Sequence, residues 1–200
     1  KNVFLGCIQE IKNDTIFLAE RGKGVRIERD GQEIKPILSS NTDLSTLFWC
    51  IGFRGRPAQA LVAVLGELID ISSVDGGVFD VGSATFSMTR LITGQMDAYI
   101  DIGKRMIDEV PWVEAEFKRV GRGTVLNNNP YDVAAAVLIV QELGCVVTDG
   151  CGGSINDYPL LGSGPEFQFS VVGAVNPGLH EKILHLIDAG IERLKGIKKP

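Results

Sequence analysis

The chain has 200 residues and a mass of 21.6 kDa, which is enough for one large domain with its own hydrophobic core. Hydrophobic residues make up 44% and charged residues 22%, a composition that excludes disordered, collagen-like and coiled-coil proteins. The net charge of −5 argues against nucleic acid as the main partner, and no uninterrupted apolar stretch approaches the roughly 20 residues of a membrane span.

The first part of the chain carries the pattern of successive antiparallel strands. Four runs with strand character lie at 3–11, 15–19, 25–29 and 33–37. Lys12-Asn13-Asp14 and Asp30-Gly31 supply turns between them, which predicts a meander. The polar segment 39–43 predicts a domain boundary, with antiparallel strands in 1–43 and an α/β domain in 44–200.

From residue 44 onward, strands and helices alternate. Buried strands are predicted at 46–51, 77–81, 97–102, 146–148 and 169–175. Helices are predicted at 58–68, 83–91 and 132–143, followed by a long final helix that begins at Asn176-Pro177. Residues 133–140 are apolar on every face, as in a helix that is covered on both sides. The charged interval 104–129 fits neither period and predicts an insertion or lid.

Cysteine and histidine usage disfavours a zinc site. None of the four cysteines forms a C-x-x-C pair, and the chain has only two histidines. Cys7, Cys50 and Cys145 lie in apolar runs and are predicted to be buried thiols, which favours a reducing, cytoplasmic location. His180 and His185 fall on the polar side of the final helix and are expected to be exposed.

The most informative stretch is residues 129–136. Either Asn129 caps a helix with Pro130 in its first position, or Asp132 is itself the cap. Both arrangements place a carboxylate in the first turn, where the helix dipole favours negative charge. This carboxylate can serve helix stability alone, or it can hold Mg²⁺ while the neighbouring backbone N–H groups hold a phosphate.

Two further segments are candidates for anion binding. Gly82-Ser83-Ala84 begins a helix, and Ser83 can cap it or donate to an anion. Arg54 and Arg56 lie in a loop after a strand, where they can contact phosphate, although a solvated loop is the simpler interpretation.

Four stretches carry a resemblance to a known family, in the family's own order. They are the Leu-Ala-Glu-Arg-Gly-Lys-Gly run at 18–24, Gly82-Ser83-Ala84, the Tyr-Asp-Val-Ala-Ala-Ala run at 131–136 with Val147-Thr148-Asp149, and residues 171–180. They resemble, in turn, the hairpin motif, the Gly-Ser-x-Ala helix start, the Trp-Asp-x-Ala-Ala-Gly signature with its strand, and the terminal strand with its Asn-Pro helix cap of the inositol monophosphatase family. That family belongs to a superfamily of Mg²⁺-dependent, lithium-sensitive phosphatases that includes fructose-1,6-bisphosphatase.

The resemblance implies a fold and a set of site residues. The expected fold is α/β, a layered αβαβα sandwich of the sugar-phosphatase type in truncated form, with a remnant antiparallel meander and a C-terminal mixed-sheet domain. In the complete enzyme Asp132 would ligate Mg²⁺, and Ser83 and Ala84 would line the phosphate or substrate pocket. The substrate would be a small phosphate ester.

The resemblance also shows an absence. The family's catalytic Asp-Pro-x-Asp-Gly-Thr motif does not occur in this sequence. Residues 1–38 match the sheet that follows this motif, so the chain resembles the C-terminal portion of a phosphatase. Because Mg²⁺ prefers about six oxygen ligands and Asp132 supplies one, we expect negligible activity and weak Mg²⁺ affinity from this chain alone.

Several positions depart from the family's pattern. Tyr131 replaces its Trp, and Ala136 replaces its Gly. In the family, a short link joins the strand matched here by Asp97-Ala98-Tyr99 to the signature Asp, and that link carries the substrate-selecting acidic residue. Here residues 104–129 intervene, and no position matches that residue. The candidates by charge alone are Glu109, Glu114 and Glu116.

The function expected from the sequence is therefore the C-terminal part of a Mg²⁺-dependent phosphomonoester hydrolase. One alternative is a non-catalytic binding or assembly module that retains the fold. Another is a sugar-bisphosphate or nucleotide-phosphate phosphatase of the same superfamily. A meander without preceding strands has an unpaired edge, and family members are commonly dimers, so we also expect a homo-oligomer.

Overall fold

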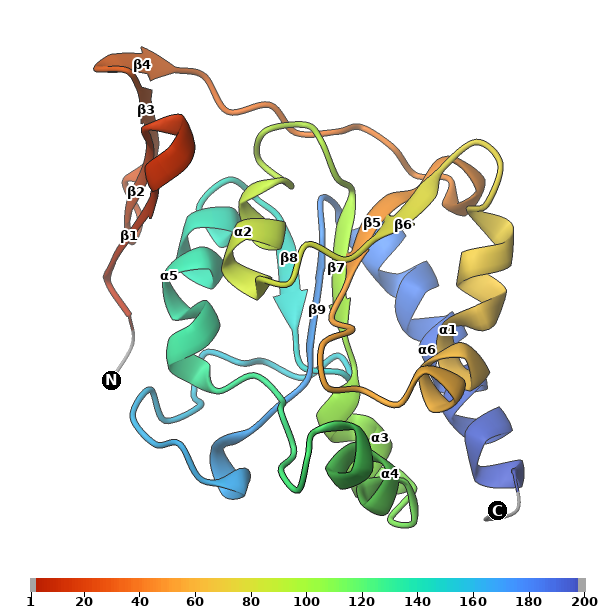
Figure 1. Ribbon diagram of the computed structural model, residues 1–200. Coiled ribbons are helices and arrows are strands. Elements are labelled where there is room, and N and C mark those ends of the chain that lie inside the picture. Colours follow the sequence, from red (N-terminus) through yellow and green to blue (C-terminus); the bar gives the residue numbers. More distant parts are fainter. Residues whose placement is uncertain (1–2, 198–200) are drawn as a thin grey trace.

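The structure is a computed structural model and describes residues 3–197 (Figure 1). Its first sheet is antiparallel, in the order β1 (Leu5–Glu10), β2 (Thr15–Glu20), β3 (Gly24–Arg29) and β4 (Gln32–Ile34). The predicted meander is confirmed. The turn between β3 and β4 has a positive φ at both Asp30 and Gly31, 51° and 73°, as a tight hairpin turn requires.

The second sheet is mixed and contains all five strands predicted after residue 44. Its order is β6 (Gly77–Phe79), β5 (Phe48–Ile51), β7 (Ala98–Asp101), β9 (Val171–Ala174) and β8 (Val146–Thr148). β5 runs parallel to β6 and to β7, whereas β9 runs antiparallel to β7 and β8. The carboxyl ends of three parallel strands therefore meet at one edge.

Helices cover both faces of this mixed sheet. The helices within residues 3–197 are α1 (Ala58–Ile71), α2 (Ala84–Thr89), α3 (Gly103–Glu109), α4 (Val113–Val120), α5 (Pro130–Gln141) and α6 (Pro177–Gly196), of which α3 and α4 lie beyond one end of the sheet (Figure 1). Figure 1 shows α2 and α5 between the two sheets, with α1 and α6 on the far side of the mixed sheet. The resulting β–α–β–α order confirms the α/β fold class and corresponds to four layers of an αβαβα sandwich.

α5 is apolar all round because both sheets pack against it. A Cβ added to Gly6 of β1 would lie 3.0 Å from the carbonyl oxygen of Ala135. The small residues in this part of α5 therefore let β1 approach the helix backbone closely.

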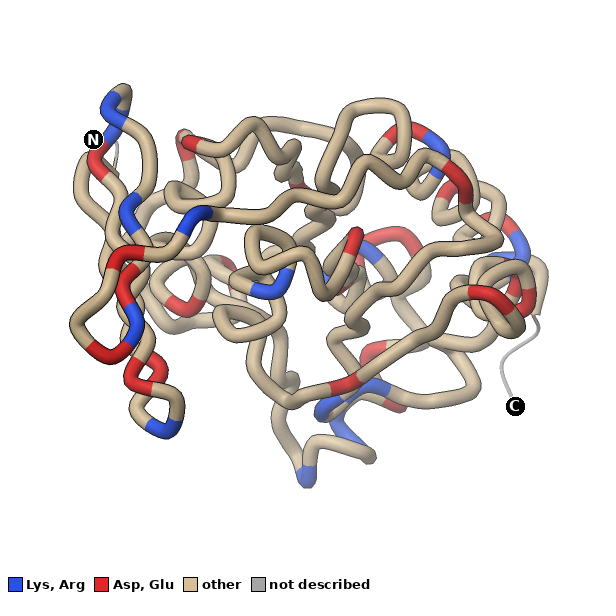
Figure 2. Tube along the Cα trace, turned by 90° about the horizontal axis from the view of Figure 1, so that it is seen from above, with Lys and Arg blue, Asp and Glu red and all other residues tan. Residues whose placement is uncertain are grey.

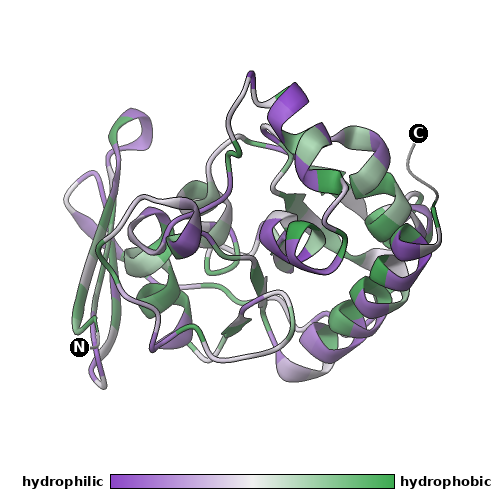
Figure 3. Ribbon diagram, turned by 90° about the horizontal axis from the view of Figure 1, so that it is seen from below, coloured by the Kyte–Doolittle hydropathy of each residue, from purple (hydrophilic) through white to green (hydrophobic). Residues whose placement is uncertain are grey.

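Polar and charged residues lie on the outside of this layered core. Figure 2 shows acidic and basic residues interspersed along the meander and the outer helices, and Figure 3 shows hydrophobic and hydrophilic residues alternating along those helices. The apolar stripe of α6 is fully buried, in agreement with its predicted spacing; its residues are Leu179, Ile183, Ile187, Ile191 and Leu194.

The contact between α1 and α6 depends on Gly190. A Cβ at this position would lie 2.1 Å from the carbonyl oxygen of Val64, which no rotamer change can relieve. We expect Gly190→Ala to lower the free energy of unfolding by about 1–3 kcal/mol, measured by denaturant unfolding. Gly196→Ala in the same helix is the control, because its Cβ would meet nothing within 4 Å. An equal effect of the two substitutions would contradict the close contact.

The interval 104–129 contains two helices that the sequence pattern did not reveal. α3 begins at Gly103, and α4 follows after a short turn. Each helix buries only a few apolar side chains, among them Met106 in α3 and Val113 and Phe117 in α4. Helices this short leave too few apolar positions for a period to be recognised.

The prediction of buried thiols is right for Cys50 and Cys145 and wrong for Cys7. Gly6 faces α5, and because successive side chains of a strand point to opposite faces, Cys7 lies on the outer face of the meander. None of the helices among residues 3–197 is long and apolar enough to cross a membrane.

The prediction that both histidines are exposed is right for His185 and wrong for His180, which is 6% exposed. The Thr148 hydroxyl donates to the carbonyl of Asp149 at 2.8 Å and lies 2.9 Å from His180 Nε2. A buried imidazole with a hydroxyl partner therefore stabilises the end of β8 against α6.

Burial lowers the pKa of His180 below its ordinary value of 6.5. Because the pKa of His180 is lower in the folded state, the unfolded chain takes up the proton at a higher pH than the folded chain does. The stabilisation that neutral His180 provides is therefore lost as pH falls below 6.5. We expect the melting temperature to fall less between pH 7 and pH 5, roughly the window of histidine titration, in His180→Gln than in the wild type. His185→Gln is the matched control, and an equal change of pH dependence in the two variants would contradict this role.

Candidate active site

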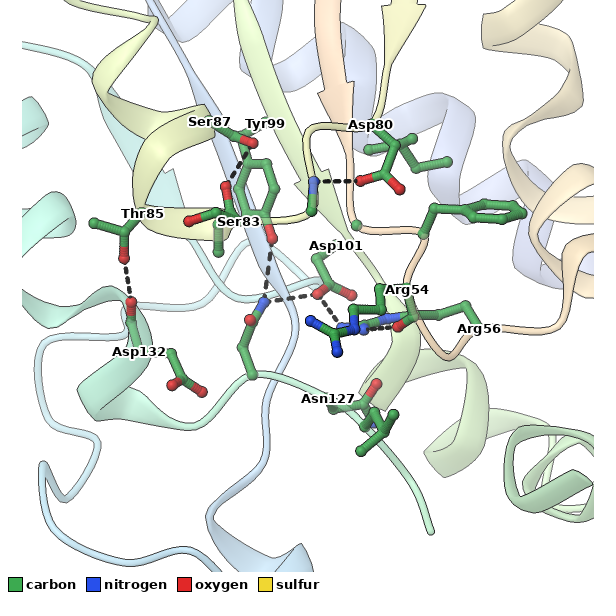
Figure 4. A pocket seen from close by; sticks show the side chains of 17 residues that line it. Arg54, Arg56, Asp80, Ser83, Thr85, Ser87, Tyr99, Asp101, Asn127 and Asp132 are labelled. Carbon is green, nitrogen blue, oxygen red and sulfur yellow. Dashed lines mark hydrogen bonds and ion pairs between the residues drawn. The ribbon is translucent and has the colours of Figure 1, made fainter. Parts of the chain in front are cut away.

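A cavity of about 440 Å³ opens at the edge where the parallel strands end. β5 leads into the loop that carries Arg54 and Arg56, β6 leads directly to Asp80, and β7 ends with Asp101. The start of α2 and the start of α5 close the other side (Figure 4). Ligand sites in α/β proteins commonly lie beyond the carboxyl ends of parallel strands, and this cavity is in that position.

The three residues predicted for the site, Ser83, Ala84 and Asp132, all line this cavity. Ser83 is exposed and caps α2, because its Oγ accepts a hydrogen bond from the N–H of Phe86 at 3.3 Å. The hydroxyl of Thr85 donates to the backbone carbonyl of Asp132 and so links the starts of the two helices. The structure therefore brings the predicted residues together, in an open cavity.

Asp132 has both a structural contact and a free surface. Asn129, not Asp132, is the N-cap of α5, and Pro130 is its first residue. The Asp132 Oδ2 atom accepts a hydrogen bond from the N–H of Asn129 at 2.8 Å, which stabilises the helix start. The side chain is nevertheless exposed to the cavity, so its remaining lone pairs are available to a ligand.

The residues present do not make a complete Mg²⁺ site. Among residues 3–197, no group of three or more His, Cys, Asp or Glu side chains lies close enough together to hold a metal ion. Mg²⁺ prefers about six oxygen ligands in octahedral geometry. Asp132 can therefore contribute one ligand, but the described part of the chain does not supply the rest.

A buried ion pair forms the floor of the cavity. The guanidinium of Arg56 pairs with the carboxylate of Asp101, and the two side chains are 7% and 1% exposed. Asp101 also accepts from the N–H of Gly103 at 3.1 Å. Burial raises the pKa of the Asp101 carboxyl, whereas Arg56 and the Gly103 N–H act in the opposite direction. The expectation of a solvated loop is therefore wrong for Arg56.

Amide and phenol groups extend this polar network. The Nδ2 of Asn128 donates to Asp101 Oδ2 at 2.6 Å and lies 3.3 Å from the hydroxyl of Tyr99. Burial raises the pKa of Tyr99, so its hydroxyl stays protonated. Asn127 lines the cavity with an amide that has no hydrogen-bond partner within residues 3–197.

None of the three glutamates considered for the substrate-selecting acid lines the cavity. Glu109 pairs with Arg105 and Lys195, Glu114 pairs with Lys118, and Glu116 pairs with Arg119. The acidic residues that do line it, besides Asp132, are Asp80 and Asp101, which the sequence analysis missed. Their signal was available, because each directly follows or ends a predicted parallel strand.

The model of the inositol monophosphatase family matches residues 1–192. The chain belongs to this family. This membership agrees with the fold, with the signature sequence at the start of α5, and with the cavity beside that helix start.

Known members share low sequence identity and a common fold with this chain. This chain is 23% identical over 160 residues to the Nus factor SuhB of Vibrio cholerae, and the match covers 80% of this chain and 48% of that protein. It is 23% identical over 188 residues to the fructose-1,6-bisphosphatase/inositol-1-monophosphatase of Methanothermobacter thermautotrophicus, covering 94% of this chain and 54% of that protein. The extragenic suppressor protein SuhB of Bartonella henselae matches in structure with a TM-score of 0.65 at 20% identity, covering 94% of this chain and 59% of the other. The chain thus spans about half the length of the curated relatives it matches.

Proposed function

We propose that this chain is the C-terminal part of a Mg²⁺-dependent phosphomonoester hydrolase of the inositol monophosphatase family. The observation that carries the proposal is the meeting of Ser83, Ala84 and Asp132 in one open cavity at the carboxyl ends of the parallel strands. Its substrate is a small phosphate ester. We also propose that the enzyme is cytoplasmic.

Each of the site residues has its own role in the proposed reaction. The exposed carboxylate of Asp132 contributes one ligand to Mg²⁺, which would polarise the phosphate ester and activate water. The helix dipole at the start of α5 favours negative charge beside that carboxylate. Ser83 and Ala84 form the wall that the ester contacts. The remaining metal ligands would come from outside this chain, because residues 3–197 contain no group of three or more His, Cys, Asp or Glu side chains that could hold a metal ion.

The experiment compares this chain with the protein translated from the complete coding sequence. Both are assayed for phosphate release from a panel of phosphate monoesters, with Mg²⁺ and with EDTA. We expect Mg²⁺-dependent turnover from the complete protein and negligible turnover from this chain alone. Turnover by this chain without a complementing chain would contradict the proposed division of the site, and no turnover by the complete protein would contradict the phosphatase itself.

A non-catalytic binding or assembly module is the second candidate. It is favoured by the incomplete metal site and by the relative named as a Nus factor. The sequence upstream of Lys1 separates the two candidates, because a catalytic member of the family is expected to carry Asp-Pro-x-Asp-Gly-Thr there.

Self-association is also part of the proposal. β1 is an edge strand of the meander, so its outer N–H and C=O groups are available to a strand of another chain. We propose a homo-oligomer, and sedimentation of the chain at several concentrations measures it.

A further inference from the structure

A second polar cavity, of about 590 Å³, lies between the antiparallel sheet and the loop that follows α2. Within the described part of the chain its lining is entirely polar, includes two arginines and has no carboxylate; the lining residues are Asn13, Arg29, Arg90, Thr93 and Gln95. The first two belong to the sheet, in the turn after β1 and at the end of β3, and the other three to the end of α2 and the loop behind it. None of them lines the candidate active site, which lies at the other end of α2.

Arg90 is the buried wall of this cavity. It is 6% exposed, and its guanidinium pairs with the carboxylate of Glu10, which is 8% exposed. Among residues 3–197, Glu10 is the one acidic residue that forms an ion pair with a lining arginine. Other charged residues lie in the two turns at this end of the sheet, but they are exposed and do not line the cavity; they are Lys12, Asp14 and Asp30.

The other lining cation, Arg29, is exposed and anchored at one atom. Its Nε donates to the hydroxyl of Thr15 at 3.0 Å, and its two terminal nitrogens have no hydrogen-bond or ion-pair partner within residues 3–197. Burial lowers the pKa of Arg90 below its ordinary value, Glu10 raises it, and the positive charge of Arg29 lowers it again. The two guanidinium groups are therefore close enough to repel each other, and one carboxylate serves both.

Gln95 supplies further donors in a fixed orientation. Its side-chain oxygen accepts a hydrogen bond from Arg90 Nη1 at 2.9 Å and lies 2.9 Å from the hydroxyl of Thr93. Because an arginine nitrogen can only donate, the Gln95 atom that faces it must be the oxygen. The Nε2 group of Gln95 then keeps two N–H donors that have no partner in the described range 3–197.

We propose that this cavity is a second anion site and that it binds a phosphate group, either inorganic phosphate or the phosphate of a small phosphorylated molecule. Arg29 and Gln95 offer donors from two different elements, and the oxygens of a tetrahedral phosphate point in different directions and can meet both. Hydrogen bonds between a guanidinium and phosphate are charge-assisted and stronger than neutral ones. The bound anion would offset the charge of Arg29 and link the antiparallel sheet to the end of α2. This site is independent of the proposed phosphatase reaction, whose residues line the other cavity.

The test is a calorimetric titration of the complete protein with inorganic phosphate and, separately, with glycerol 3-phosphate. Ionic strength is held constant, and EDTA removes the divalent metal that would hold a phosphate in the active site. The variants are Arg29→Gln, Gln95→Glu and Arg26→Gln. Gln95→Glu keeps an oxygen facing Arg90 and replaces the free N–H donors by a negative charge. Arg26 is the control because it is exposed on the same strand, pairs with Glu28 and lies outside the cavity.

We expect phosphate to bind the wild type about tenfold more tightly than Arg29→Gln or Gln95→Glu. Arg26→Gln and Asp132→Asn should bind it as the wild type does, and all variants should retain the wild-type melting temperature within a few degrees, roughly the shift of a 1 kcal/mol change. The probe that binds more tightly identifies the ligand as free phosphate or a phosphate ester. An equal loss in Arg26→Gln, a loss confined to Asp132→Asn, or no binding overturns the inference. A loss confined to Asp132→Asn would still leave the proposed phosphatase function standing.

Discussion

Under the proposed function, Asp132→Asn is expected to reduce kcat/KM of the complete protein for a phosphate ester by more than about a hundredfold. The loss of even an outer contact to a metal site typically costs 10- to 100-fold, roughly, and a direct ligand costs more. Asn is the informative substitution because its Oδ1 can still accept the hydrogen bond that Asp132 receives from the N–H of Asn129. The start of α5 is then preserved while the negative charge in the cavity is removed.

Two measurements separate this role from a structural one. The free energy of unfolding of Asp132→Asn should stay within about 1 kcal/mol of the wild type, since only a charge–dipole contribution is lost. Activity should be restored in part by higher Mg²⁺ if Asp132 is a ligand. Asp108→Asn, an exposed carboxylate that pairs with Lys104, is the control and should retain full activity. Near-wild-type turnover in Asp132→Asn would remove this residue from the site.

Apart from α3 and α4, the elements of the fold were predictable because their signals are local. Turn residues such as Asp30-Gly31 and helix starts such as Asn176-Pro177 act on their immediate neighbours. Asp132 and Ser83 were singled out as candidates for the same reason, because both belong to helix starts that the sequence marks. Whether a helix start faces an open cavity is a different question, which only the packing of α2 and α5 answers.

The wrong predictions have different physical causes, and one of them is a contact between distant segments. Arg56 and Asp101 are separated by 45 positions, so nothing near either residue shows that the other neutralises it. His180 was assigned to the polar side of α6 because of its chemistry, although its spacing from Ile183 and Ile187 places it on the buried face. Cys7 was misplaced because an apolar run does not say which of its alternate residues faces the core.

Arg56→Met is expected to cost about 3–5 kcal/mol of the free energy of unfolding, because it leaves the buried carboxylate of Asp101 without its partner. Met retains most of the side-chain volume, so the loss reports charge and not a cavity. The double variant Arg56→Met with Asp101→Leu should recover part of the loss, since no uncompensated charge remains. Arg26→Met is the control for an exposed pair, with Glu28, and should cost less than about 1 kcal/mol.

The pH dependence of Arg56→Met gives an independent test of the same contact. Burial already raises the pKa of Asp101, and without Arg56 nothing of comparable strength opposes that rise. A carboxyl whose folded pKa is raised contributes its stability at low pH and loses it as pH increases through that pKa. The deficit of Arg56→Met relative to the wild type should therefore shrink as the pH is lowered in denaturant unfolding experiments. A deficit that is the same at every pH would show that the guanidinium stabilises this floor of the cavity by packing and not by its charge.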